Sequence, residues 1–330
     1  MKNFYGQNRL TVLLIILSCL LPMLLLGTPA YALESLLLIR ADGKGFEQAV
    51  QGLKEELEEE FSISEMLATP DTSAEQLAQE MQRVSPQILV LMDNIAITLC
   101  KSYQKGLPES APIVPSVCLM ASFMDIAIQG MRNATGIFYE VPLVTSVVNL
   151  RVISPSVPLN KVGVVYRAFM EPSVTINHQY CQKEGIDLVS YQVSNEENIR
   201  SELRKGLKNL KQEGIEALWI PNDNQLVNVN LLKSVWLPFA KKFKKPIIAG
   251  ADVLVEPKLK FGTFAVIPDH LRLGAQAADI VFDVMENAWQ VGDQEIEPPR
   301  SVYKTINFKQ AKRLLKVDED DLTNIDKILK

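Results

Sequence analysis

Short hydrophobic runs alternate with amphipathic segments along most of the chain. Residues 36–39 (LLLI) form an uninterrupted hydrophobic run, which is typical of a strand buried on both faces of a parallel sheet. Residues 46–60 then place Phe, Val and Leu at helical spacing, with a row of glutamates on the solvated face. The same pattern predicts further strands at residues 61–66, 87–92, 112–119, 135–139, 161–166, 186–193, 216–220, 246–249, 262–267 and 301–307. It predicts further helices at residues 73–84, 95–105, 142–153, 172–184, 198–212, 226–243 and 269–287, and a charged helical tail at the end of the chain.

This alternation is interrupted once by a proline-punctuated stretch, Ser154-Pro155-Ser156-Val157-Pro158, and then starts again. Strands separated by helices predict doubly wound parallel sheets, with ligand sites at the carboxyl ends of the strands. Even without the first 32 residues, 298 residues remain, and this length exceeds what one hydrophobic core usually organises. The fold class is therefore predicted to be α/β, with two parallel-sheet lobes that face each other across a cleft.

The N-terminus has the three regions of a secretory signal peptide. Lys2 and Arg9 precede the uncharged apolar residues 10–26, and Ala30-Tyr31-Ala32 supplies the small-x-small ending. We therefore expect residues 1–32 to be removed, so that the mature chain starts at Leu33 and is periplasmic. An uncleaved membrane anchor is the main alternative, because the apolar run is just long enough to span a bilayer. Acylation at Cys19 is a weaker alternative, since the residues before it fit a lipoprotein signal poorly.

Composition and charge exclude several classes of protein. The chain is 47% hydrophobic and 22% charged, which excludes a long disordered protein. Lys+Arg number 34 against 39 Asp+Glu, and this acidic balance argues against a nucleic-acid partner. No G-x-G-x-x-G, P-loop or G-x-S-x-G motif occurs, so neither a nucleotide cofactor nor an esterase-type nucleophile is expected.

Cysteine and histidine are too sparse for a metal centre. After the signal segment only Cys100, Cys118 and Cys181 remain, with no CxxC spacing, and the two histidines are His178 and His270. We expect no metal and no Ser-His-Asp triad, hence a protein that binds without catalysis. A Cys100–Cys118 disulfide stays open as an alternative to three small core residues.

Polar residues that follow the predicted strands are the candidate ligand site. They are Arg40, Asp93, Asn94, Tyr166, Arg167, Asp223, Asn224 and Asp252. Asp and Asn at such positions commonly cap the next helix, which is the structural alternative for each of them. The functional hypothesis depends on Asp223 and Asp252, which follow neighbouring strands and could jointly hold one cationic group.

Several segments carry a family resemblance. Residues 133–137 (NATGI) followed by residues 161–166 (KVGVVY) resemble the exported solute-binding proteins of ABC importers, in the branch that includes tryptophan- and phenylalanine-binding members. Residues 217–224 (ALWIPNDN) resemble a strand and P-x-D-N turn of that branch. Residues 246–255 and 273–278 resemble its next strand with an acidic loop and the start of its returning helix. The similarity covers roughly residues 85–315.

The resemblance implies a periplasmic-binding-protein type I fold whose lobes are joined by three crossings and close on a small solute. The N-terminal lobe would combine residues 33–140 with 268–299, and the C-terminal lobe residues 141–267 with 300–330. The implied partner is the membrane permease of an ABC importer. A periplasmic sensor that reports a ligand to a membrane signalling protein is the alternative.

The resemblance also suggests which residues touch the ligand. Asp223, Asn224 and Asp252 match polar ligand-side positions of the second lobe. Asp93 departs from the Gly-Thr turn of the amino-acid-binding members, and residues 118–121 (CLMA) depart from their Thr-Asp-Pro turn. Because an aspartate would repel a carboxylate in a closing cleft, these departures favour a ligand that is held by an amine or another cationic group.

Overall fold

The N-terminal sheet is built from five parallel strands, in the order β2-β1-β3-β4-β5. The computed structural model describes residues 33–330, so the expected signal peptide lies outside the described residues. β1 lies between β2 and β3, with Leu38 opposite both Glu65 and Val90. The bounds of these strands are β1 Glu34–Arg40, β2 Phe61–Leu67, β3 Ile88–Met92, β4 Ser116–Leu119 and β5 Ala134–Gly136.

The C-terminal sheet has seven strands, in the order β12-β11-β10-β9-β8-β6-β7. Every neighbouring pair is parallel except β10 and β11, which are antiparallel. The bounds of these strands are β6 Lys161–Tyr166, β7 Asp187–Gln192, β8 Ala217–Ile220, β9 Ile247–Ala249, β10 Phe264–Pro268, β11 Val302–Asn307 and β12 Lys327–Leu329.

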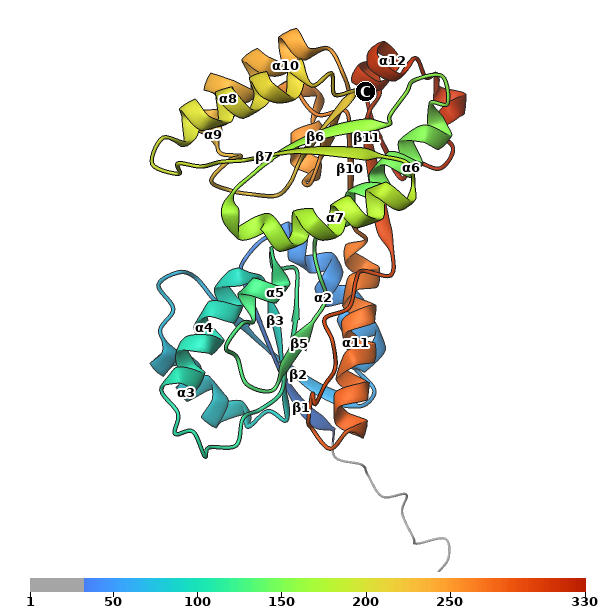
Figure 1. Ribbon diagram of the computed structural model, residues 1–330. Coiled ribbons are helices and arrows are strands. Elements are labelled where there is room, and N and C mark those ends of the chain that lie inside the picture. Colours follow the sequence, from blue (N-terminus) through green and yellow to red (C-terminus); the bar gives the residue numbers. More distant parts are fainter. Residues whose placement is uncertain (1–32) are drawn as a thin grey trace, which may run out of the picture.

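Helices cover both faces of each sheet, so that each lobe has two hydrophobic layers (Figure 1). In the N-terminal lobe one layer contains α2 and α11, and the other contains α3, α4 and the short α5. In the C-terminal lobe α6, α7 and α12 lie on one face, and α8 and α10 on the other. The bounds of these helices are α2 Lys44–Leu57, α3 Ala74–Val84, α4 Asn94–Lys105, α5 Met124–Ala127, α6 Leu143–Ile153, α7 Glu171–Lys183, α8 Ile199–Gln212, α9 Val229–Leu231, α10 Leu237–Phe243, α11 His270–Glu286 and α12 Phe308–Leu315.

The chain passes between the two sheets three times. It leaves the first sheet after β5, returns after β10 to place α11 against α2, and goes back to the second sheet at β11. The backbones of α2 and α11 lie very close together. A Cβ on Gly52 would lie 1.9 Å from the carbonyl oxygen of Leu271, and one on Gly274 would lie 2.0 Å from that of Ala49. Glycine at both positions is therefore what allows α11 to pack against the first lobe.

The predicted α/β fold with two doubly wound sheets is confirmed, and four details differ from the expectation. The strand expected at residues 112–119 begins only at Ser116, because Pro112 and Pro115 cannot donate to a ladder. The helix expected at residues 226–243 starts at α9, where the Asn228 side chain accepts from two backbone N–H groups, and it continues through a π-helical segment, Leu232–Trp236, into α10. The charged tail ends in β12 rather than in a helix, and α5 was not expected.

The lobe limits expected at residues 140/141, 267/268 and 299/300 remain a prediction, and the membership of the two sheets agrees with them. The three cysteines of the described residues are buried and form no disulfide in this structure: Cys100, Cys118 and Cys181. This agrees with the alternative that they are small core residues. Within residues 33–330, no helix is both long and apolar enough to cross a membrane.

Candidate functional site

A cavity lies where the two lobes meet, beside the first crossing. About 20 Å³ of it is free for a water-sized molecule, within an open volume of about 460 Å³ that includes solvent space. The C-terminal lobe contributes the carboxyl ends of β8 and β9, the crossing contributes a short segment, and the N-terminal lobe contributes one aromatic side chain. The lining residues are Phe123, Tyr139, Glu140, Val141, Ser146, Met170, Ser173, Trp219, Pro221, Asn222, Ile248, Ala249, Gly250 and Val266. This is the place at which a doubly wound fold binds ligands.

Gly250 keeps two strand ends of this cavity close together. A Cβ at this position would lie 2.8 Å from the backbone nitrogen of Asn222 and 3.2 Å from the carbonyl oxygen of Ile220. The Gly250 N–H donates to that same carbonyl at 2.7 Å. The turn that follows β8 and the loop that follows β9 are thereby held side by side along one wall.

Glu140 is the only acidic residue among those that line the cavity. It is half-buried, and its Oε1 accepts a hydrogen bond of 2.9 Å from the backbone N–H of Phe123. Burial raises the pKa of Glu140 to about 7, with a further increase from Asp125, although the hydrogen bond from Phe123 lowers it. No salt bridge to Glu140 is present in the described part of the chain. A buried carboxyl group with no cationic partner is one that a cationic ligand would stabilise.

Two contacts join the lobes next to this cavity. The Asn222 side-chain amide donates to the Ser122 hydroxyl at 3.2 Å. The rings of Phe123 and Phe169 meet edge to face, with centroids 4.8 Å apart. Both contacts use the loop after β4, in which Phe123 has a φ of 55°. This loop is therefore the part of the first lobe that touches the second lobe at the cavity.

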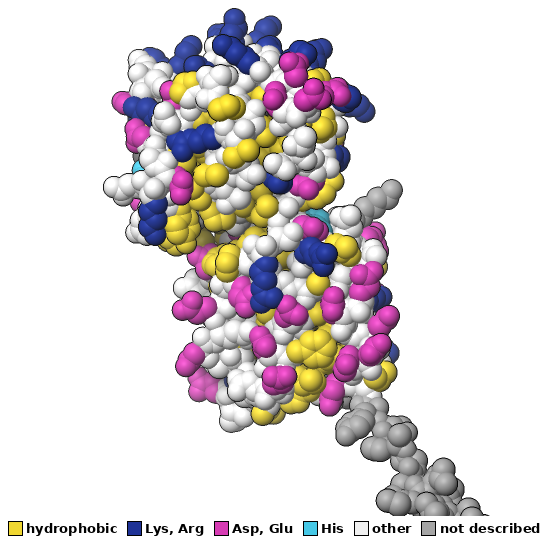
Figure 2. All heavy atoms as spheres, turned by 90° about the vertical axis from the view of Figure 1, so that its right-hand side faces the viewer, with side chains coloured by type: hydrophobic (Ala, Val, Ile, Leu, Met, Phe, Trp, Pro, Cys, Tyr) yellow, Lys and Arg dark blue, Asp and Glu magenta, His cyan; other side chains and the backbone are white. Residues whose placement is uncertain are grey.

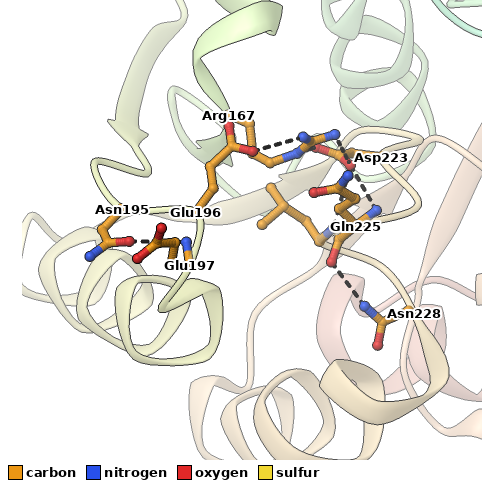
Figure 3. Close-up of polar contacts among 8 residues, drawn as sticks. Arg167, Asn195, Glu196, Glu197, Asp223, Gln225 and Asn228 are labelled. Atoms are coloured by element: carbon orange, nitrogen blue, oxygen red, sulfur yellow. Dashed lines mark hydrogen bonds and ion pairs between the residues drawn. The ribbon is translucent and has the colours of Figure 1, made fainter.

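Arg167 and Asp223 form a bidentate ion pair inside the C-terminal lobe (Figure 3). The Nε and Nη2 atoms of Arg167 lie 2.8 and 2.9 Å from the two oxygens of Asp223, and Nη1 lies 3.1 Å from Glu196. Asp223 is only 2% exposed, and it also accepts the backbone N–H of Gln225. Burial alone would lower the pKa of Arg167, but the hydrogen bonds from its guanidinium to Asp223 and Glu196 raise it. In this structure Asp223 is therefore paired with Arg167, and the contact of Asp223 and Asp252 with one cationic ligand remains a prediction.

The Arg167 guanidinium also links this ion pair to the lobe contact. It lies over the ring of Phe169, 4.5 Å from the centroid, and that same ring meets Phe123 of the first lobe. The order of contacts is thus Asp223, Arg167, Phe169 and Phe123.

Asp93 and Asn94 serve the backbone around them. The Asp93 carboxylate accepts the N–H groups of Ile95 and Ala96 at 2.8 and 2.9 Å, and so caps α4. Burial raises the pKa of Asp93, against the effect of these two hydrogen bonds. Its φ of 94° is one that glycine adopts readily, which fits a turn where the resembling proteins carry Gly-Thr. Asn94 exchanges two hydrogen bonds with the backbone of Ser122 and thereby holds the loop after β4.

Asp252 lies in the loop after β9, close enough to the hinge to affect two of its side chains. Tyr139 and His270 contact each other there, with the hydroxyl 3.0 Å from Nε2. The pKa of Tyr139 is raised to about 12, mainly by burial and then by the negative charges of Asp252 and Glu140. Burial lowers the pKa of His270, while Asp252 and Asp269 counteract this decrease. Asp252 therefore acts electrostatically on the hinge, although it does not line the cavity.

The remaining predicted residues lie outside the cavity. The Tyr166 hydroxyl donates to Glu171, and its pKa is raised to about 12, first by burial and then by that hydrogen bond. Arg40 is buried against Glu65 at 3.1 Å and Glu47 at 3.4 Å, beside β2. Asn224 is exposed.

Sequence reasoning thus found the correct end of the sheets but not the side chains that line the cavity. None of the eight predicted residues is among the lining residues, and their contact with a ligand remains a prediction. Glu140, Tyr139, Phe123 and Trp219 were missed. A usable signal existed for the first of these, since Glu140 is a charged residue inside the predicted crossing at residues 139–142.

The described residues contain no group of three or more His, Cys, Asp or Glu side chains that could hold a metal ion. Burial raises the pKa of the Cys100 thiol to about 11, so this cysteine is not a reactive thiolate. The polar groups that line this cavity are the Glu140 carboxyl, the Asn222 amide and the hydroxyls of Tyr139, Ser146 and Ser173, and the rest of its wall is apolar or aromatic.

Comparison with known proteins agrees with this geometry. Residues 38–325 match the family model described as ABC transporter substrate binding protein. No curated protein matches the chain. Three solved structures each match 90% of this chain, and the match covers 100% of the other chain. They are a substrate binding protein with adhesive properties from Clostridium difficile in its ligand-free, open form (15% identity, TM-score 0.65), a conserved domain protein from Vibrio cholerae (17%, 0.56), and an ABC domain from Streptococcus pneumoniae in complex with L-Trp (18%, 0.55).

These matches confirm the resemblance seen in the sequence and the periplasmic-binding-protein type I fold that it implied. At such low identity the solved structures support the fold alone.

Proposed function

Because the chain belongs to the ABC transporter substrate binding protein family, we propose that it is the extracytoplasmic solute-binding subunit of an ABC importer. It captures a small organic solute between its lobes and delivers it to a membrane permease. The observation that carries this proposal is the cavity between the lobes, which residues of both lobes line beside the first crossing.

The proposed solute carries an amine or another cationic group together with an apolar or aromatic body. Glu140 supplies a carboxylate without a cationic partner, next to the rings of Tyr139, Phe123 and Trp219. An aromatic face attracts a cation and also packs against an apolar body. The sequence analysis expected a cation held by Asp223, Asp252 and Asp93. The proposed anchor is instead Glu140, because Asp223 already pairs with Arg167.

Binding at Glu140 is coupled to lobe closure by its position in the chain. Glu140 lies in the first crossing, and its carboxyl group also holds the backbone of Phe123 in the loop that touches the second lobe. A cation at Glu140 lowers the energy of the ionised carboxylate while it stays bonded to that loop. The ligand therefore favours the arrangement in which the lobes meet, as in hinge closure of two-lobed binding proteins.

A thermal-shift comparison of matched ligands tests the proposal. Phenethylamine, phenylpropionate and phenylalanine share an aromatic body and differ in their charged groups, and short aliphatic amines remove the ring. We expect stabilisation by amines, because a ligand at 100 times its dissociation constant adds about 2.7 kcal/mol. Stabilisation by phenylpropionate but not by phenethylamine would contradict an amine ligand, and no stabilisation by any small organic solute would contradict the binding function.

A further inference from the structure

Charge is divided very unevenly between the two lobes. Residues 33–140 and 268–299 contain 8 Lys+Arg against 23 Asp+Glu, whereas residues 141–267 and 300–330 contain 24 against 16. Figure 2 shows the consequence: Lys and Arg side chains gather at the top of the upper lobe, and Asp and Glu side chains dominate the lower lobe. The overall acidity of the chain thus hides a basic C-terminal lobe.

The basic side chains are concentrated on one helical layer of that lobe. We define the basic face as the exposed Lys and Arg side chains of residues 199–212 and 229–245. Its members are Arg200, Arg204, Lys205, Lys208, Lys211, Lys233, Lys241, Lys242, Lys244 and Lys245, and every one of them is exposed. These two segments contain a single acid, Glu202.

The basic face is continuous, and its charges are mostly unpaired. The Arg204 guanidinium donates to the carbonyl oxygen of Ser234 at 3.2 Å, which joins α8 to the neighbouring helix. Within the described part of the chain, Lys205 with Glu202, at 3.6 Å, is the one ion pair that involves the face. On the opposite side of α8, Leu203 and Leu207 are buried in the hydrophobic core. The face is therefore an array of cations of which only Lys205 has an acidic partner within the described residues.

We propose that the basic face binds the anionic headgroup surface of a lipid membrane. This inference rests on the export that is part of the proposed function, but it does not depend on the identity of the solute. Eight of the ten side chains are lysines, which act as mobile point charges and do not provide the planar fork that recognises one carboxylate. A fluid lipid surface can match such an array, because its headgroups move to meet the charges.

The acidic first lobe sets the orientation. Its surplus of acids is repelled by an anionic surface, so the protein lies with the basic face towards the membrane and the N-terminal lobe away from it. A second copy of this chain is the competing partner, since its acidic lobe is also complementary to the basic face. Such a contact is heterologous and leaves both ends unsatisfied, so it would produce open chains of molecules rather than a closed dimer.

Co-sedimentation with lipid vesicles tests the proposal. The exported protein is mixed with vesicles of phosphatidylcholine alone or with added phosphatidylglycerol, at low and at high salt. One variant replaces Lys208, Lys211, Lys241 and Lys242 by Gln. The matched control replaces Lys105, Lys183, Lys309 and Lys327 by Gln, which changes the net charge equally but leaves the basic face intact; all eight lysines are exposed.

We expect binding only to the anionic vesicles, and weaker binding at high salt because salt screens the charges. Each lysine near the surface contributes about 1 kcal/mol, or about fivefold in affinity. The basic-face variant should therefore bind at least tenfold more weakly, even if only two of its four lysines reach the lipid. The control variant should bind like the unmodified protein, and both should keep their solute affinity.

Three results would overturn the proposal. They are equal binding to neutral vesicles, an equal loss of binding in the control variant, and salt-sensitive self-association in ultracentrifugation without vesicle binding. The last result would assign the face to a second copy of the chain. If the unmodified protein bound no small solute, that result would count against the proposed function and not against membrane binding. The failure of one proposal is therefore distinguishable from the failure of the other.

Discussion

Replacing Glu140 by Gln should make the ligand-free protein more stable and should lower its affinity for the solute. Burial raises the pKa of Glu140 from 4.5 to about 7 in the folded chain. The folded state thus holds this proton more tightly than the unfolded state does. The stability that the group contributes is fully present below pH 4.5 and is lost as the pH rises towards 7. A difference of this size corresponds to about 3 kcal/mol above pH 7, as an upper limit.

Glutamine removes this titration and keeps an oxygen that can accept the Phe123 N–H. At pH 8, Glu140→Gln should therefore raise the free energy of unfolding by up to about 3 kcal/mol, whereas at pH 4.5 the two proteins should be nearly equal. The affinity for an amine ligand should fall by about 2–5 kcal/mol, because the cation then enters a cavity without its charge partner.

Thermal melts from pH 4.5 to 8 and isothermal titration with the best amine ligand measure both effects. The exposed Glu109→Gln serves as the control for removing one acid, and it should change neither quantity appreciably. Equal stability of Glu140→Gln and the unmodified protein at pH 8 would refute the reasoning about burial. An unchanged affinity for the amine would refute the role of Glu140 as the anchor.

Three further substitutions test other parts of the structure. Arg167→Ala leaves the Asp223 carboxylate buried without its partner and should destabilise the protein by about 3–5 kcal/mol in urea unfolding, and Asp223→Asn in the same chain should restore part of that loss. Phe123→Ala removes an edge-to-face ring contact of about 0.5–1.5 kcal/mol between the lobes, so the radius of gyration without ligand should increase in small-angle scattering. Gly52→Ala forces a Cβ against α11 and should destabilise the protein by about 1–3 kcal/mol or more, whereas Gly45→Ala in the same helix has nothing within 4 Å and should stabilise it by up to about 1 kcal/mol. Stabilisation by both alanines would contradict the close approach of the two helices.

Most of the fold could be predicted because the inner strands of both sheets are buried on both faces. Residues 36–39 are fully buried in β1, and such runs are recognisable without any knowledge of their neighbours. The ends of the strands depend instead on which backbone N–H groups are available to pair. Proline at positions 112 and 115 delays the start of β4, and the edge position beside β11 allowed three residues of the charged tail to pair as β12.

The site could be predicted only in part, because the state of each polar residue depends on partners that are distant in the sequence. Asp223 is neutralised by Arg167, which is 56 positions away. Glu140 lines one cavity together with Phe123, Trp219 and the strand ends of the second lobe, which no local pattern reveals. A loop aspartate looks the same in the sequence whether it caps a helix, as Asp93 does, or faces a ligand.

The acids near the cleft differ in how much of their charge the protein itself satisfies. Asp223 has two contacts from Arg167 and two from backbone N–H groups, and Asp93 has two backbone N–H groups at the start of α4. Glu140 has one backbone N–H and a second acid, Asp125, in its neighbourhood. Of these three acids, Glu140, at the crossing between the lobes, therefore has the fewest partners within the protein. In the proposed function this crossing is where the lobes close, so a cationic solute bound at Glu140 changes the energy of closure directly. Recognition of the solute and closure of the cleft then depend on the same carboxyl group, and Glu140→Gln should weaken both together.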